Sequence, residues 1–336
     1  MRTGRGGQFL RVRHGVRGLA LGQASTVADT VRRTALGTHR VRPTSSGAAR
    51  PHRAEVAIRG ERVSYSVVGS GDPVVLIHGL AGSMRWWRRN VAALAEQYTV
   101  YLVNLPGFGA FRRRRLPFAL AGAADWLGAW IEAADTAPCH IVAHSMGGHI
   151  AIRLAAQKPA LVRRLVLVAP ALVAGRKRLK AYPLALVAAT RAMAPSFLPL
   201  LAIDTLRAGP FTILSAARSL LADDIRAELR EIVAPTLLVW GERDALVPPS
   251  LGLLAQAEIA DAHLLLLPGA GHVAQYDRPH QFNAATLAFL AGETVGSAPS
   301  PWHQQPHSPV DAQKDSADAS AGPIKNGQMA STSQDG

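Results

Sequence analysis

The sequence predicts an α/β protein with a mostly parallel central sheet, helices on both faces and an inserted helical cap. Three observations lead to this fold class. Six short runs between residues 73 and 269 are continuously apolar, as strands covered on both faces are. Helical patterns separate most of these runs, and repeated strand–helix units build parallel sheets. One interval, residues 171–232, spans roughly sixty residues, far more than a crossover helix needs.

A hairpin precedes the repeated units. Residues 55–69, EVAIRGERVSYSVVG, alternate apolar and polar side chains on either side of a glycine-containing turn, which is typical of an exposed strand pair. The expected strands then follow as PVVLIHG, YTVYLVNL, CHIVAHS, RLVLVAP, PTLLVWGE and AHLLLLPG. The expected helices lie in MRWWRRNVAALAEQ, FALAGAADWLGAWIEAAD, MGGHIAIRLAAQ, SLGLLAQAEIA and PHQFNAATLAFLA. The predicted core therefore consists of residues 55–170 and 233–293.

The long interval, residues 171–232, is interpreted as the cap because it is helix-like and unusually apolar. Its most apolar stretch, 181–203, is interrupted by Arg191, Pro195 and Pro199, which disfavours a membrane-spanning helix. The leucine, alanine, isoleucine and phenylalanine side chains of the cap either roof an apolar substrate pocket or form the cap's own core. Both interpretations stay open at the level of sequence.

Most of the net charge lies in an N-terminal arm. Residues 1–54 hold eleven arginines, no lysine and one acidic residue, Asp29, which gives +10 of the chain's +14. This composition cannot bury a core, so we expect a disordered arm, although it also suits an organelle transit peptide. Residues 294–336 predict a disordered tail.

The one cysteine, Cys139, is compatible with a reducing compartment, so we expect a cytoplasmic protein and keep organelle targeting open.

Ser145 is a candidate nucleophile. In AHSMGGHIA, residues 143–151, it follows an expected strand and precedes an expected helix, close to the G-x-S-x-G pattern that turns a serine hydroxyl out of a sheet. Ala143 replaces the first glycine of that pattern. The alternative is a helix cap with Gly147 and Gly148 as packing residues. A serine hydroxyl needs a base that a third group orients, so the partners of Ser145 must decide.

Two further strand ends carry suitable partners. Asp244 follows PTLLVWGER, and His272 follows AHLLLLPGAG. Because the carboxyl ends of parallel strands share one edge of a sheet, we expect these side chains to meet Ser145 there. The alternatives weighed for the acid and the base are Glu242, Asp261, Asp277, His144 and His149.

These motifs resemble the α/β-hydrolase superfamily with a cap domain, over roughly residues 55–292. The three catalytic stations of that family are a serine elbow, a WGxxDxxxP segment and a GxGH segment, and this chain has AHSMGG, WGERDALVP and GAGH. The resemblance implies a catalytic triad of Ser145, Asp244 and His272. It also implies an oxyanion hole made by the backbone N–H groups of Leu80 and Met146.

Two neighbouring positions are interpreted as structural. His78 lies in LIHGLAGS, and Asn104 stands in NLPGFG where an aspartate is more usual, which bears on local hydrogen bonding. No metal-ligand set, phosphate loop or dinucleotide fingerprint accompanies the motifs, so we expect no cofactor and no metal.

The expected activity is that of a serine hydrolase acting on a small apolar ester-like substrate through an acyl-enzyme. Thioester hydrolysis, carbon–carbon bond hydrolysis and perhydrolysis stay open, as does a ligand-binding protein without activity. Nucleic-acid binding is not expected, because Phe9 is the one Phe, Tyr or Trp residue of the arm, so the arm has no series of rings to stack bases. The solvated-charge interpretation also covers FRRRRLP, residues 111–117. The basic start of the cap, residues 176–180, permits contact with an anionic membrane surface. The oligomeric state stays open.

Overall fold

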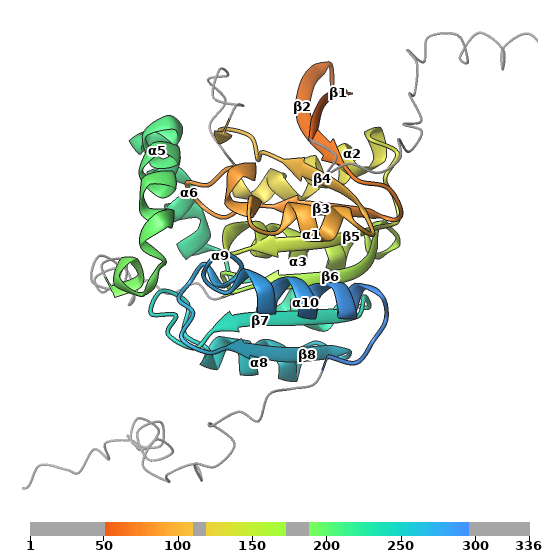
Figure 1. Ribbon diagram of the computed structural model, residues 1–336. Helices are drawn as coiled ribbons and strands as arrows, with labels where there is room; N and C mark the ends of the chain where they lie inside the picture. The colour runs from red at the N-terminus through yellow and green to blue at the C-terminus, as the bar shows by residue number, and fades with distance from the viewer. Residues whose placement is uncertain (1–50, 110–118, 173–187, 296–336) are drawn as a thin grey trace, which may run out of the picture. The chain divides into compact units, whose positions relative to one another are not determined.

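The computed structural model describes residues 51–109, 119–172 and 188–295, which contain one eight-stranded sheet (Figure 1). Nearly all of the predicted arm and tail, the FRRRRLP segment and the basic start of the cap lie outside the described residues. The strands are β1 (His52–Ile58), β2 (Glu61–Val68), β3 (Pro73–Ile77), β4 (Thr99–Val103), β5 (Cys139–His144), β6 (Val162–Val168), β7 (Thr236–Gly241) and β8 (Ala262–Leu267).

The strand order confirms a mostly parallel sheet. The order is β1-β2-β4-β3-β5-β6-β7-β8, in which β1, β2 and β4 pair antiparallel and the pairs from β4 to β8 are parallel. The hairpin is found as predicted, but β1 begins at His52, so residues 52–54 belong to a strand rather than to the arm. Residues 52–54 pair with residues 65–67 of β2. The strand β1 therefore begins three residues before position 55, where the sequence composition suggests that the arm ends.

Both faces of the sheet are buried, which explains the continuously apolar runs. In β3, Val75 and Ile77 join one core cluster, while Val74 and Leu76 join the other. The helices α2 (Ala123–Ala133), α3 (Met146–Gln157) and α8 (Ser250–Glu258) contribute to the first cluster. The helices α1 (Val91–Ala95) and α10 (Pro279–Leu290) contribute to the second. Helices therefore cover both faces, as the sequence predicts.

One predicted helix is wrong in its extent. Residues 84–97 form a short 3-10 helix, η1 (Met84–Trp87), followed by the five-residue α1. The chain turns between them because the two tryptophans enter different clusters: Trp86 packs against the inserted segment, and Trp87 packs on the α10 face of the sheet. Asn90 holds this turn, since its amide Nδ2 donates to the carbonyl of Gln275 at 2.9 Å.

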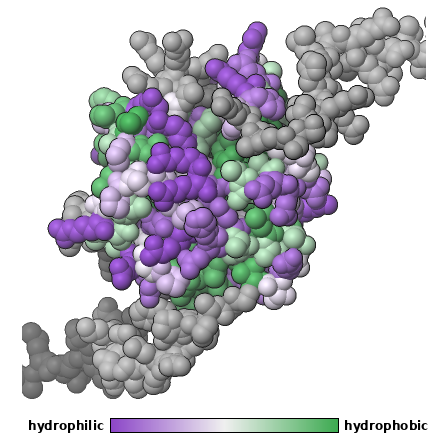
Figure 2. Space-filling view, in the orientation of Figure 1, coloured by the Kyte–Doolittle hydropathy of each residue, from purple (hydrophilic) through white to green (hydrophobic). Residues whose placement is uncertain are grey.

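The inserted segment is helical where the structure describes it. A helical stretch at residues 188–192 leads into η6 (Pro195–Phe197), α5 (Leu198–Ala208), α6 (Pro210–Ala222) and α7 (Arg226–Arg230). The helices α5 and α6 lie on the side to which the arrow of β7 points, and hydrophobic side chains gather there on the surface (Figures 1 and 2). No single helix among the described residues is long and apolar enough to cross a membrane, although α5 and α6 reach that length together with a bend of 97°.

An ionic cluster joins this segment to α3. The guanidinium of Arg153, on α3, donates to Asp223 at 2.7 Å and to Glu228 at 3.0 Å. His149 lies 3.1 Å from the same Asp223 carboxylate. Since α3 starts beside the candidate nucleophile, these contacts tie the inserted segment to the helix that positions Ser145.

Candidate active site

The structure brings together the three side chains that the family resemblance singles out. Ser145 lies between β5 and α3, Asp244 follows β7, and His272 lies between β8 and the short helix α9 (Ala274–Asp277). The Ser145 hydroxyl lies 3.0 Å from His272 Nε2, and His272 Nδ1 lies 2.8 Å from Asp244 Oδ2. An ionised carboxylate only accepts hydrogen bonds, so Nδ1 carries the proton and Nε2 is free to accept from the serine hydroxyl. All three side chains are buried.

The backbone at Ser145 decides between an elbow and a simple helix cap. Ser145 has φ 52° and ψ −115°, a conformation that costs energy for any residue with a side chain. Its hydroxyl makes no capping hydrogen bond to α3, although Ser145 occupies the N-cap position. The strained backbone instead directs the hydroxyl toward His272. Gly147 and Gly148 do pack closely: a Cβ at Gly147 would lie 2.6 Å from the carbonyl oxygen of His78.

Asp244 is the carboxylate that contacts His272, and the alternative acids have other partners. The second oxygen of Asp244, Oδ1, accepts from the N–H groups of Leu246 and Val247, both at 2.9 Å. Glu242 accepts from the N–H of Gly269 at 2.9 Å. Of the two others, Asp261 lies 3.9 Å from His263, and Asp277 accepts from the N–H groups of Ala194 and Gly271.

The neighbouring histidines are buried and form hydrogen bonds with groups other than Ser145. His144 Nε2 donates to the carbonyl oxygen of His272 at 2.9 Å, which fixes the loop that carries the candidate base. Burial, reinforced by the nearby His272, holds the pKa of His144 well below its usual value. His149 Nδ1 lies 2.8 Å from the carbonyl oxygen of Ala171, and burial also lowers the pKa of His149. Neither side chain reaches Ser145 in any described hydrogen bond.

The turn after β3 carries one of the two candidate oxyanion N–H groups, that of Leu80, and α3 carries the other, that of Met146. Leu80 lies in this turn, which the Gly82 N–H closes by donating to the carbonyl of Gly79 at 3.0 Å. A Cβ at Gly79 would lie 3.1 Å from the Ser145 Cβ, so the turn directly adjoins the serine and needs glycine at this position. Within the described residues, no group accepts a hydrogen bond from the N–H of Leu80 or of Met146. Met146 is the first residue of α3, where an N–H has no partner inside the helix.

His78 and Asn104 hold the base of this turn. His78 Nδ1 donates to the carbonyl of Gly79 at 2.8 Å, and His78 Nε2 accepts from the N–H of Leu105 at 3.1 Å. The Asn104 side chain accepts from the N–H of Met84 at 2.9 Å. These contacts agree with the structural roles that the sequence suggests for both residues.

Asp204 is a buried residue of the site region that the sequence analysis did not identify. It lies on α5 of the inserted segment and is 2% exposed. Its Oδ2 accepts from the Ser83 hydroxyl at 2.8 Å and from the Trp86 indole N–H at 3.1 Å, and its Oδ1 pairs with Arg85. Ser83 follows the turn that contains Leu80. The inserted segment is therefore fixed to the candidate oxyanion turn through one carboxylate.

An apolar cluster lies beside the three side chains. The Trp86 ring lies 5.7 Å from the His144 ring, which in turn lies 4.9 Å from the His272 ring. This cluster joins the inserted segment to the loops that carry the site, and its buried members are Trp86, Ala189, Met193, Phe197, Leu200, Val273 and Tyr276. The apolar side chains of the segment thus pack partly onto the site loops and do not form a separate core alone.

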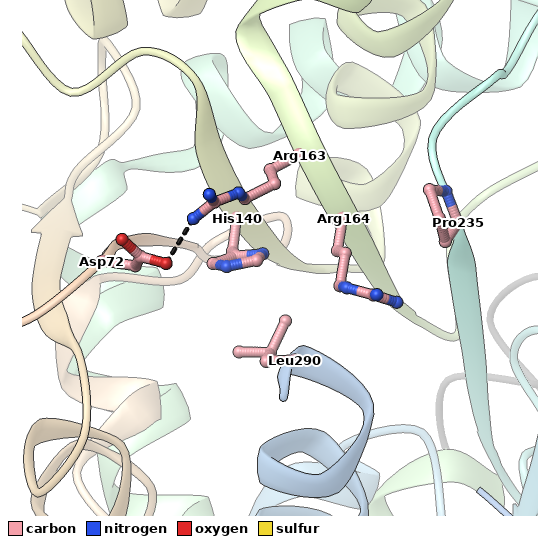
Figure 3. A pocket seen from close by; sticks show the side chains of 6 residues that line it. All are labelled: Asp72, His140, Arg163, Arg164, Pro235 and Leu290. Carbon is pink, nitrogen blue, oxygen red and sulfur yellow. Dashed lines mark hydrogen bonds and ion pairs between the residues drawn. The ribbon is translucent and has the colours of Figure 1, made fainter. Parts of the chain in front are cut away.

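A hollow of about 280 Å³ lies at the other edge of the sheet, away from Ser145 (Figure 3). Its lining comes from residues at or before the amino ends of strands, together with α10: Asp72, His140, Arg163, Arg164, Pro235 and Leu290. The two guanidinium groups point apart, one to Asp72 and the other away from it, so they do not converge on a ligand. Ligands of open parallel sheets bind at the carboxyl ends of the strands, which favours the Ser145 edge. In the described part of the chain, no group of three or more ligating side chains could hold a metal ion.

The buried histidines make the fold sensitive to acid. Burial lowers the pKa values of His78 and His140 to about 4, from the ordinary 6.5. As the pH falls, the unfolded chain takes up these protons first, so their contribution to stability is complete above about pH 6.5 and is lost toward about pH 4. For His78 we expect the free energy of unfolding to drop by about 2 kcal/mol between pH 7.5 and pH 5.

Urea unfolding at the two pH values measures this loss. The His140→Gln variant removes one such group without touching Ser145 or its partners, so its free energy of unfolding should depend less on pH than that of the parent. An unchanged pH dependence in His140→Gln would contradict the assignment of His140 as a buried neutral histidine.

Comparison with known proteins agrees with the fold. The model of the Alpha/beta hydrolase family matches residues 74–285. The dihydrolipoyllysine-residue acetyltransferase component of the acetoin cleaving system of Pseudomonas putida is 30% identical over 263 residues, 71% of this chain and 69% of that protein. The pimeloyl-(acyl-carrier protein) methyl ester esterase of Nitrosospira multiformis is 28% identical over 252 residues, 66% of this chain and 95% of the esterase. Among solved structures, a bacterial membrane phospholipase A is 26% identical with a TM-score of 0.62, covering 73% of this chain and 86% of its own. These likenesses confirm the predicted fold class.

Proposed function

We propose that this chain, which belongs to the alpha/beta hydrolase family, is a serine hydrolase that cleaves carboxylic esters of apolar acyl or alcohol groups through an acyl-enzyme. One observation carries the proposal: Ser145 Oγ lies 3.0 Å from His272 Nε2, and His272 Nδ1 lies 2.8 Å from Asp244 Oδ2. The fold alone does not determine the chemistry, because the same scaffold hosts many reactions. The proposal therefore rests on a nucleophile, a base and an orienting carboxylate in hydrogen-bond contact.

In the proposed acylation, His272 Nε2 takes the proton of Ser145 as Oγ attacks the ester carbonyl carbon. The negative charge that develops on the carbonyl oxygen is stabilised by the N–H groups of Leu80 and Met146, which have no other described acceptor. Asp244 remains ionised and holds His272 with Nε2 toward the serine. When the carbon–oxygen bond of the ester breaks, His272 gives its proton to the leaving alkoxide, and the alcohol departs.

In the proposed deacylation, water replaces the alcohol. His272 takes a proton from the water as its oxygen attacks the acyl carbon, and the same two N–H groups stabilise the second oxyanion. The bond between the acyl carbon and Ser145 Oγ then breaks. Ser145 recovers its proton from His272, and the carboxylic acid is released. These steps need only side chains and backbone groups of this chain, and no cofactor or metal.

An apolar substrate is supported by the residues around the site. The cluster of Trp86, Met193 and Phe197 adjoins the His272 loop, and it supplies large apolar surfaces rather than fixed charges. Ligand pockets typically combine such surfaces with a few polar groups that orient the reacting bond. The names of two relatives fit this class, since one is a methyl ester esterase and the other a phospholipase.

A series of p-nitrophenyl esters from acetate to dodecanoate tests the proposed substrate class. We expect kcat/KM to rise by up to about fourfold per added methylene until the pocket is full, because each buried methylene contributes about 0.8 kcal/mol. An optimum at medium chain length agrees with an apolar pocket beside Ser145.

Other outcomes separate the competing functions. A steady decline in kcat/KM from acetate onward contradicts an apolar acyl pocket. Cleavage of a vinylogous diketone acid without ester hydrolysis would assign the same triad to carbon–carbon bond hydrolysis. Preferred turnover of acyl thioesters would indicate a thioesterase. Preferred reaction of peroxide with a carboxylic acid would indicate a perhydrolase. Saturable ligand binding without any turnover would instead indicate a binding protein.

A further inference from the structure

Most of the large hydrophobic side chains that the described residues leave exposed lie on one pair of helices. Phe211 is 88% exposed and Leu206 is 78% exposed, at the junction of α5 with α6. Leu198 and Ile203 of α5 and Leu214 of α6 extend the same surface. We name these residues the apolar corner: Leu198, Ile203, Leu206, Phe211 and Leu214. The one other exposed large hydrophobic residue in the described part of the chain, Val233, lies before β7 at the opposite edge of the sheet.

The packing of α5 and α6 explains why the corner projects outward. The inner positions of the two helices, Leu200, Asp204, Ala208 and Ala216, are buried. The two helices meet at 97°, so the residues on either side of Gly209 stand at the outside of a bend. Surface helices normally carry polar residues on their outer positions. Here aliphatic and aromatic side chains occupy them, which marks an interaction surface.

The charges around the corner have one sign. Between residues 188 and 222 the sequence has one carboxylate, Asp204, and it is buried against Ser83, Arg85 and Trp86. The two arginines on these helices, Arg207 of α5 and Arg218 of α6, are exposed and form no ion pair with a described residue. A surface of protruding apolar side chains flanked by unpaired arginines complements a layer of anionic headgroups above hydrocarbon.

We propose that the apolar corner docks this protein onto the surface of an anionic phospholipid bilayer, with Leu206 and Phe211 inserted among the acyl chains. The two most exposed side chains project from a bend, which suits insertion into a fluid layer better than contact with a flat protein surface. The arginines contact the headgroups at the same time. The corner lies on the side of the carboxyl ends of the strands, where Ser145, His272 and Asp244 also lie (Figure 1). Docking does not depend on the proposed ester chemistry.

A reporter at one position distinguishes this docking from binding through the basic N-terminal arm. The sequence has one cysteine, Cys139, which is buried, and burial raises its pKa to about 12, so its thiol resists labelling. Two variants of the full chain are prepared, Phe211→Cys and Val233→Cys, each together with Ser145→Ala to prevent hydrolysis. The introduced cysteine of each variant is labelled with an environment-sensitive nitrobenzoxadiazole dye. Both proteins are mixed with phosphatidylcholine vesicles with and without phosphatidylglycerol. We expect the dye at 211 to brighten and shift to the blue with the anionic vesicles, while the dye at 233 stays unchanged.

Co-sedimentation with the same vesicles measures the contribution of the side chains. The double variant Leu206→Ser and Phe211→Ser should bind about tenfold or more weakly than the parent, whereas Val233→Ser should bind as the parent does. Circular dichroism of the variants checks that each is folded. The proposal is overturned if the dye at 211 does not respond while the protein sediments, because binding then runs through another segment. It is also overturned if the dye responds to protein concentration without vesicles, because the corner then contacts a second copy.

Discussion

Replacing Ser145 by alanine should lower kcat for an activated ester by about 10³-fold or more, with little change in stability. In the proposed mechanism Ser145 Oγ forms the bond to the acyl group, and removing one member of a triad typically leaves only the contribution of binding and of the oxyanion hole. Alanine keeps the Cβ and differs only in the hydroxyl, which makes no capping bond in the folded chain. The loss of rate can therefore be assigned to chemistry rather than to unfolding.

A second serine provides the control. Ser250 is exposed at the start of α8, and Ser250→Ala should hydrolyse the ester as the parent does. Steady-state kinetics on the parent and both variants, together with urea unfolding of each, separate the two effects. A Ser145→Ala protein that keeps a tenth or more of the parent kcat would rule out Ser145 as the nucleophile.

Replacing Asp204 by alanine should lower the free energy of unfolding by about 3 kcal/mol, because three donors lose their shared buried acceptor. It should also lower kcat by roughly 10- to 100-fold with a smaller effect on KM. The physical reason is that Ser83, next to the turn of Leu80, loses its anchor on α5, and small misplacements of an oxyanion donor have large effects on rate. Urea unfolding and steady-state kinetics measure the two quantities.

Asp72 offers a matched carboxylate in a different setting. It pairs with Arg163, but its side chain is more than half exposed, so Asp72→Ala should cost about 1 kcal/mol or less and leave kcat unchanged. If Asp204→Ala does not fold, Asp204→Asn replaces it in the test. Asparagine keeps an acceptor oxygen for Ser83 and Trp86 but removes the charge that pairs with Arg85. We therefore expect a loss of unfolding free energy between those of the parent and of Asp204→Ala. Equal urea midpoints for the parent and both Asp204 variants would contradict the anchoring role.

Much of the fold could be predicted from the sequence because the strands are buried on both faces. The continuous apolar runs of β5, β6 and β7 leave little ambiguity about a covered parallel sheet. The extent of the elements is harder to predict. The helix expected over residues 84–97 is broken because Trp86 and Trp87 enter different clusters, and one of these contains side chains about a hundred positions further along the chain. Local periodicity carries no information about such distant partners.

The candidate site also contains residues that the sequence could predict and one that it could not. Ser145, Asp244 and His272 could be identified because each stands at a strand end within a short motif, and the topology of a parallel sheet brings such ends together. Asp204 could not be identified from the sequence, because it lies in no motif and its partners Ser83 and Trp86 are more than 110 positions away along the chain. One signal was available: Asp204 is the one carboxylate in an otherwise apolar stretch, and a buried carboxylate requires donors.

Covalent labelling tests most directly whether Ser145 is a nucleophile activated by His272 and Asp244. The full-length parent protein is treated with a fluorophosphonate probe, and the modified peptide is identified by mass spectrometry, alongside Ser145→Ala and Ser250→Ala. We expect one adduct on the peptide that contains Ser145, present in the parent and in Ser250→Ala and absent from Ser145→Ala. Labelling of Ser145→Ala to the same extent as the parent, or an unlabelled parent, would show that Ser145 is not an activated nucleophile.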